Sequence, residues 1–282
     1  MDRDFRNMKL REREGVHFLT FPALEALPAF RHAFSTRLGG VSANEFSSLN
    51  LSFGRGDADG NVRENYRRFC RAAGFAPGSL VSSLQVHGAA VRRVGRENRG
   101  EGFSKPKPAG ADALVTNEPG VTLVIHTADC VPLFFLDPVK RAAGLAHAGW
   151  RGTAAEIGAE TVRAMAREFG TDPEDLVCGI GPSIGPCCFE VDAPVYDVFA
   201  AKRELSPGEW TREDGGGKYR VDLWEANRRI LMRAGVPERR IAVSGICTKC
   251  HADLLYSHRA SGGKRGGLAA FLVLREEVPD AD

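Results

Sequence analysis

Thr127-Ala-Asp-Cys130 through Gly149-Trp-Arg151-Gly152 is the stretch around which the chain is organised. Apolar runs at residues 121–125 and 133–136 precede a turn at Asp137-Pro138, and the run at residues 142–146 returns after it. Short apolar runs bounded by turn residues are typical of strands in a buried sheet. The stretch therefore predicts two apolar β runs joined by a turn, with Thr-Ala-Asp-Cys interrupting the first run.

Four polar or reactive side chains lie where this apolar pattern breaks: Asp129, Cys130, His147 and Arg151. A buried sheet accommodates such groups when they are paired, bound to a ligand or facing a cavity. A strand-end Cys and a strand-borne His, brought together by one hairpin, can bind a metal or form a nucleophile–base pair. Taken singly, they fit a buried structural thiol and a hydrogen-bonded core imidazole. Together they favour a functional site.

The composition is that of a soluble globular protein. The chain has 282 residues, with 43% hydrophobic and 26% charged residues and a net charge of +2, which gives no reason to expect nucleic acid or an anionic membrane as a partner. The charged start lacks the apolar core of a signal peptide, and no apolar run is long enough to span a bilayer. Seven cysteines in a chain of this size indicate reduced thiols and a cytoplasmic location.

The rest of the chain mixes strand and helix patterns. We expect one α+β domain over residues 16–276, with a mixed sheet and helices packed on it, after a flexible tail at residues 1–15. Helical spacing is found at residues 62–73, 153–169 and 221–233, and strand patterns at residues 80–88, 111–116, 176–180, 241–245 and 267–274.

The helix predicted at residues 153–169 begins beside Arg151. Thr153 and Glu156 have the spacing of a capping box, in which each side chain satisfies a free backbone N–H group of the first turn. The remaining N–H groups and the helix dipole would point toward the surroundings of Arg151, which favours an anion pocket there.

Four cysteines lie outside the central stretch, as the adjacent Cys187-Cys188 and as the Cys-x-x-Cys pair of Cys247 and Cys250. The second pair has no partner pair at zinc-finger spacing, and Cys187 and Cys188 are the available additions. Structural packing is the favoured interpretation of adjacent cysteines. A structural zinc site and a catalytic redox pair are the alternatives.

Five motifs, taken in order, resemble the bacterial YfiH family, which is also called the laccase-domain or multicopper polyphenol oxidase family. The similarity runs from Phe34-Ser-Thr-Arg37 to the last predicted strand. One departure is Gly266-Gly267, where many relatives carry Gly-Arg, with Arg265 displaced. The motifs are Gln85-Val-His-Gly88, Thr127-Ala-Asp-Cys-Val-Pro132, Ala146-His-Ala-Gly-Trp-Arg-Gly152, Gly181-Pro-Ser-Ile-Gly-Pro-Cys-Cys-Phe-Glu-Val191 and Tyr256-Ser-His-Arg259.

The resemblance implies an α/β sandwich related to the catalytic domain of a bacterial deamidating toxin. It implies a metal ion, usually zinc, held by His87, Cys130 and His147. It also implies purine nucleoside phosphorylase activity, with adenosine deaminase and methylthioadenosine phosphorylase activities in the same site. Copper-dependent phenol oxidation and the editing of peptidoglycan precursors are the other activities attributed to the family.

The residues themselves agree with a catalytic zinc. Two His and one Cys leave a fourth position open, as catalytic zinc sites do, and zinc lowers the pKa of bound water to about 7, which suits deamination. Asp129 is the candidate for general acid–base work or for orienting a ligand. Arg37, Arg151 and the start of the helix at residue 153 are the candidates for binding phosphate.

Three other interpretations remain open. Cys130 and His147 can act as a thiolate–imidazolium pair on amides, in which case His87 is dispensable. Multicopper oxidation requires more His ligands than the seven in this chain provide, although a single copper ion fits such a site. A metal-stabilised binding protein, with Cys250 or His251 as fourth ligand, is the non-catalytic alternative. The expected partners are a nucleoside and phosphate, without nucleic acid or membrane, and the expected state is a monomer or weak homodimer.

Overall fold

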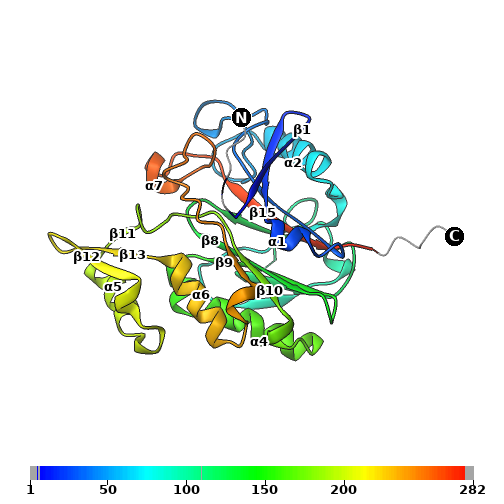
Figure 1. The fold of residues 1–282 in the computed structure, drawn as a ribbon. Helices are drawn as coiled ribbons and strands as arrows, with labels where there is room; N and C mark the ends of the chain where they lie inside the picture. Colours follow the sequence, from blue (N-terminus) through cyan, green and yellow to red (C-terminus); the bar gives the residue numbers. More distant parts are fainter. Residues whose placement is uncertain (1–4, 6, 109, 277–282) are drawn as a thin grey trace.

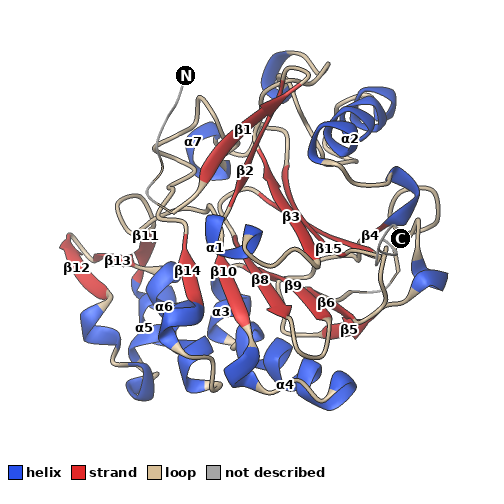
Figure 2. Ribbon diagram, turned by 45° about the vertical axis from the view of Figure 1, so that its right-hand side comes forward, coloured by secondary structure: helices blue, strands red, loops and turns tan. Residues whose placement is uncertain are grey.

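Two six-stranded sheets form the centre of the protein (Figure 2). This computed structural model describes residues 5, 7–108 and 110–276. Both sheets are mixed, because β4–β7, β5–β6 and β10–β14 are parallel pairs among antiparallel ones. The first sheet consists of β1 (Lys9–Arg13), β2 (Val16–Thr20), β3 (Phe30–Ser35), β15 (Leu268–Leu274), β7 (Thr122–Thr127) and β4 (Leu80–Val81), in that order. The second consists of β14 (Ile241–Val243), β10 (Val177–Ile180), β8 (Val131–Asp137), β9 (Ala142–Ala148), β6 (Ala113–Thr116) and β5 (Val91–Arg93).

Helices cover the outer faces of both sheets (Figure 1). α2 lies against the first sheet, whereas α4 and α6 lie against the second. A third, small sheet in the order β11-β13-β12 lies beside α5. The helices are α1 (Pro22–Glu25), α2 (Asp59–Ala73), α3 (Trp150–Ala154), α4 (Ile157–Phe169), α5 (Ala193–Ala200), α6 (Leu223–Arg233) and α7 (His258–Ser261), and the small strands are β11 (Glu190–Asp192), β12 (Thr211–Gly215) and β13 (Lys218–Val221).

The apolar core forms three layers. Between the two sheets, Ile125 of β7 and Phe134 of β8 belong to one buried cluster. Outside the first sheet, Phe69 of α2 stacks on Phe271 of β15 with ring centroids 4.5 Å apart. Outside the second sheet, Met165 of α4 packs in a cluster with residues of β8, β9 and α6. The predicted α+β sandwich is therefore confirmed, with two mixed sheets rather than one.

The first of the two predicted β runs is divided between the sheets. β7 pairs with β15 in the first sheet, while β8 pairs with β9 in the second. Residues 128–130 are therefore the crossing between sheets, and Asp129 adopts a left-handed conformation there, with φ of 87°. The polar residues that interrupt the apolar pattern lie where the chain changes layers. The predicted hairpin itself, β8–β9, is correct.

The capping box predicted for the helix at residues 153–169 is wrong, because the helix is broken. α3 ends at Ala154 and α4 begins at Ile157, with Glu156 in a left-handed conformation at φ of 56°. The Glu156 carboxylate binds Lys202 Nζ at 2.8 Å instead of a backbone N–H group at residue 153. A tertiary ion pair therefore replaces the local contact that the spacing predicts.

The expected tail and one expected strand differ from the structure. The tail expected at residues 1–15 is wrong over Lys9–Arg13, which form β1 and pair with β2. Residues 1–4 and 6 lie outside the described part. The strand expected at residues 80–88 is confined to Leu80–Val81, and His87 has a φ of 61°.

Among the described residues, no helix has the length and apolar character needed to cross a membrane.

Candidate functional site

His87, Cys130 and His147 converge from three separate elements. His87 lies in the loop after β4, Cys130 precedes β8, and His147 lies in β9. The ring centroids of His87 and His147 are 4.8 Å apart. One ligand atom from each of the three residues lies within 4.8 Å of the other two. A tetrahedral ion with Zn–S of about 2.3 Å and Zn–N of about 2.0–2.1 Å separates its ligand atoms by roughly 3.3–3.6 Å, so small side-chain movements suffice for one metal ion.

Asp112, which the sequence analysis did not select, supports two of these three residues. It is fully buried directly before β6, and its Oδ1 lies 2.9 Å from His147 Nδ1. The same carboxylate accepts backbone N–H bonds from Val86, His87 and Gly88, at 2.9–3.1 Å. Because a carboxylate at neutral pH only accepts hydrogen bonds, Nδ1 of His147 carries the hydrogen and Nε2 is left free for a metal.

The charges of the three central groups are strongly coupled. Burial raises the pKa of the Cys130 thiol, but interactions with His147 and His87 outweigh it and lower that pKa to about 6. Burial lowers the pKa of His147, but the Cys130 sulfur and the Asp112 carboxylate raise it to about 9. Without a metal, the geometry therefore favours a thiolate beside an imidazolium. Both a soft metal ion and a nucleophile–base pair use a thiolate.

The loops that carry the ligands are held by specific hydrogen bonds. The Gln85 side chain binds both backbone groups of His126, donating to its O at 2.7 Å and accepting from its N at 2.8 Å. This bridge attaches the loop of His87 to β7. His87 and Asp129 both have positive φ, a conformation that non-glycine residues adopt at a cost and that clusters at functional sites.

The Asp129 carboxylate binds two other loops. Its Oδ1 accepts from Thr248 Oγ1 at 2.6 Å, and its Oδ2 accepts from Arg259 N at 2.7 Å. Its backbone O accepts from Ile184 N at 2.9 Å. These contacts fit a residue that fixes the crossing next to Cys130.

The side chains of His87, Cys130 and His147 line a cavity of about 200 Å³, and cationic side chains also lie on its wall. Arg55, Lys107 and Arg265 line it together with His126 and Gln85. Arg265 is only 8% exposed, and its Nε has no hydrogen-bond partner among the described residues. Burial and the charge of Arg55 lower the pKa of Arg265 to about 10, so this guanidinium is charged at neutral pH. A largely buried guanidinium on the wall of a cavity is suited to an anion.

The arginines selected from the sequence lie elsewhere. Arg37 donates from Nε to Ser47 O at 2.9 Å and from Nη1 to Ala252 O at 2.8 Å, and it lines a neighbouring cavity. Arg151 is exposed and stacks over the ring of Trp150, with its guanidinium carbon 4.3 Å from the centroid. Neither lines the cavity that contains Cys130. The cationic wall of that cavity comes instead from residues that carry no sequence motif of their own.

A two-sheet α/β sandwich with a His/Cys centre between its strand-end loops defines the class of protein. Residues 31–275 match the family model described as "Multi-copper polyphenol oxidoreductase laccase", and the chain belongs to this family. The resemblance to the YfiH family noted from the sequence is thereby confirmed.

Several relatives carry the same activity in their names. "Purine nucleoside phosphorylase YlmD" of Geobacillus stearothermophilus is 42% identical over 247 residues, covering 86% of this chain and 89% of the relative. "Purine nucleoside phosphorylase YfiH" of Escherichia coli K12 is 35% identical over 240 residues, covering 85% and 92%. Among solved structures, the Bacillus licheniformis hypothetical protein YfiH superposes with a TM-score of 0.89 at 33% identity, covering 94% of this chain and 99% of that one.

Proposed function

We propose that this protein is a zinc-dependent purine nucleoside phosphorylase acting on adenosine, inosine and methylthioadenosine, with adenosine deaminase activity in the same site. The proposal is carried by a three-ligand His/Cys centre and a buried Arg265 guanidinium on the wall of one cavity. Nη1 of Arg265 donates to Gly266 O, whereas its Nε has no hydrogen-bond partner among the described residues. Phosphorolysis needs an electrophilic or acid–base centre and an anion site within reach of one substrate. The names of the relatives agree with this proposal.

The donor set fits zinc. Two imidazoles and one thiolate are ligands that zinc prefers, and three protein ligands leave a position open, as in catalytic sites. When bound there, zinc supplies Lewis-acid polarisation and lowers the pKa of a coordinated water. Copper binds the same donors more tightly by the usual affinity order. A multicopper oxidase, however, requires several copper sites, and the described residues form one mixed His/Cys cluster and one all-Cys cluster.

The roles of the chain's own residues follow from their contacts. Asp112 holds His147 in the tautomer that binds metal and fixes the backbone of the His87 loop. Arg265 and Lys107 provide positive charge for phosphate on the cavity wall. Asp129 is assigned to holding the crossing, because both of its carboxylate oxygens are engaged in hydrogen bonds.

A second candidate function rests on the same centre. Cys130, His147 and Asp112 have the nucleophile, base and orienting group of an amide hydrolase, with His147 Nδ1 at 2.9 Å from Asp112. Such an enzyme would act on a glutamine-type amide or on a peptidoglycan precursor. It does not require His87, which makes His87 the residue that separates the two functions.

Metal analysis of the purified protein combined with a phosphate-dependent assay tests the proposed function. We expect about one zinc in the His/Cys centre and release of free purine base from adenosine or inosine only when phosphate is present. Base release without phosphate would indicate a hydrolase. Zinc without any nucleoside turnover would favour the amide hydrolase.

Replacing Arg265 with alanine is expected to raise the KM for phosphate about 10- to 100-fold, because hydrogen bonds to charged groups are worth about 1.5–3 kcal/mol. Arg265→Lys keeps the charge but loses the planar fork. Its KM for phosphate should therefore lie between those of the wild type and Arg265→Ala. Zinc content should remain that of the wild type. If Arg151→Ala raises the KM for phosphate and Arg265→Ala does not, the phosphate site lies where the sequence alone suggested.

A further inference from the structure

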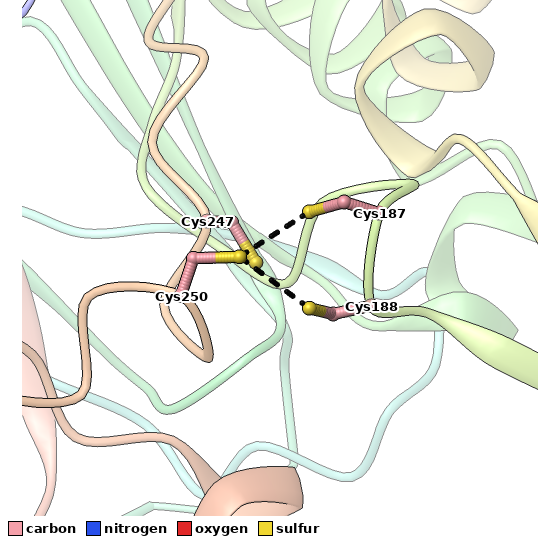
Figure 3. A group of neighbouring side chains, drawn as sticks. All are labelled: Cys187, Cys188, Cys247 and Cys250. Atoms are coloured by element: carbon pink, nitrogen blue, oxygen red, sulfur yellow. Dashed lines mark hydrogen bonds between the residues drawn. The ribbon is translucent and has the colours of Figure 1, made fainter.

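Four cysteines outside the candidate active site come together in a second cluster (Figure 3). Cys187 and Cys188 lie in the loop after β10, whereas Cys247 and Cys250 lie in the loop after β14. β10 and β14 are adjacent parallel strands, so the loops that follow them begin at the same end of the sheet. The sequence favoured structural packing of the adjacent cysteines and kept a zinc site as an alternative, and the structure shows that the two pairs meet.

The sulfur positions match a single tetrahedral ion. One Sγ from each residue lies within 4.8 Å of the other three, and Cys250 Sγ is 3.5 Å from both Cys187 Sγ and Cys188 Sγ. With Zn–S of about 2.3 Å, a tetrahedral site separates its sulfurs by about 3.8 Å. A disulfide needs about 2.05 Å, and all four cysteines are free. An iron–sulfur cluster distributes its thiolates over several irons and therefore needs a wider spacing.

We propose that Cys187, Cys188, Cys247 and Cys250 bind one zinc ion as a closed structural site. Four thiolate ligands fill the coordination sphere and leave no position for a substrate, which is the arrangement of structural zinc. Four sulfurs this close together repel one another once ionised unless a cation neutralises them. The site is independent of the zinc proposed at His87, Cys130 and His147.

The backbone around the cluster is preorganised for such a site. The Gly185 N–H donates to Cys247 Sγ at 3.3 Å, and a Cβ added at Gly185 would lie 2.6 Å from the Trp224 ring. Arg220 Nη1 donates to Cys187 O at 3.0 Å and so holds the loop that carries Cys187, while the same guanidinium is paired with Asp214 and Glu190. N–H donation to sulfur stabilises a thiolate-rich site.

The cluster also fastens two loops that hold Asp129. Ile184 N donates to Asp129 O, and Thr248 Oγ1 donates to Asp129 Oδ1. Ile184 lies three residues before Cys187, and Thr248 directly follows Cys247. A zinc ion joining the loops would therefore hold the crossing at residues 128–130 without touching substrate. We expect its loss to lower thermal stability and, secondarily, activity.

The test compares two substitutions of the exposed Cys250 in the full-length protein, purified under reducing conditions without added metal. Cys250→Ser is expected to remove about one zinc per chain, whereas Cys250→His, which restores a zinc ligand, should retain it. The same difference should appear in a His87→Ala background, where the other proposed site is disabled. Unchanged zinc content in Cys250→Ser would overturn the proposal, whatever the nucleoside activity shows.

Cobalt substitution provides a second measurement that does not depend on zinc counting. In the His87→Ala protein, Co²⁺ should give the intense thiolate-to-cobalt absorption of a tetrahedral thiolate site. Cys70→Ala, which removes a buried cysteine outside the cluster, should keep this absorption, and Cys187→Ser should diminish it. Equal spectra for all three proteins, or a disulfide among the four cysteines in protein purified without oxygen, would show that the cluster is not a metal site.

Discussion

Cys130→Ala is expected to abolish phosphate-dependent base release and to remove the zinc of the His/Cys centre together. The substitution takes away the only anionic ligand of the three, and two imidazoles hold a divalent cation far less well than two imidazoles with a thiolate. Lewis-acid stabilisation is worth several kcal/mol, so a loss of about 4 kcal/mol corresponds to about a 10³-fold fall in kcat/KM. Zinc content and initial rates are measured on the same preparation.

His87→Ala provides the matched comparison, because it removes a metal ligand and leaves the Cys130–His147–Asp112 arrangement in place. If the metal carries the chemistry, His87→Ala should be as inactive as Cys130→Ala. If Cys130 is a nucleophile, His87→Ala should retain most of the activity and Cys130→Ala should lose it. Phosphorolysis that persists in a zinc-free Cys130→Ala protein would eliminate both mechanisms.

The parts of the fold that the sequence predicted are those determined by local pattern. The helix at residues 62–73 and its end at Gly74 follow from apolar spacing and from the left-handed conformation that glycine adopts there, with φ of 77°. The β8–β9 hairpin likewise follows from two apolar runs around Asp137-Pro138. The division of β7 and β8 between sheets was not predictable in this way, because strands of both sheets are buried and show the same pattern.

The candidate site likewise contains residues that the sequence indicated and residues that it did not. His87, Cys130 and His147 were found through motifs and a family resemblance, and the structure brings them together. Asp112 has no motif of its own, and only its position as an acidic residue directly before a buried apolar strand could have indicated it. Arg265 reaches the cavity from the irregular segment between α7 and β15, whose path spacing does not predict.

The sequence offered a zinc site at these four cysteines only as an alternative to structural packing, and the reason is topological. Cys187 and Cys250 are 63 residues apart, and they meet because β10 and β14 are neighbours in the sheet. Sequence spacing identifies zinc sites whose ligand pairs lie within one small motif. It cannot identify a site assembled by the pairing of two distant strands.

Asp112→Ala is expected to weaken metal binding about 10- to 100-fold, the usual effect of removing a carboxylate that orients a histidine ligand. It should also destabilise the fold by about 3–5 kcal/mol, because His147 and three backbone N–H groups lose a buried acceptor. Zinc affinity is measured by competition with a chelator, and stability by denaturant unfolding of the metal-free protein. A merely structural role would lower stability and leave the zinc affinity of the folded protein unchanged.

Asp112→Asn separates charge from shape. If the amide oxygen faces His147, its NH₂ group opposes the N–H groups of Val86 and Gly88. If the NH₂ group faces His147 Nδ1, the imidazole hydrogen moves to Nε2 and blocks the metal. Either orientation weakens metal binding while filling the same volume, so Asp112→Asn should lose zinc affinity to nearly the same degree as Asp112→Ala but less stability. Wild-type zinc affinity in Asp112→Asn would mean that the carboxylate does not set the tautomer of His147.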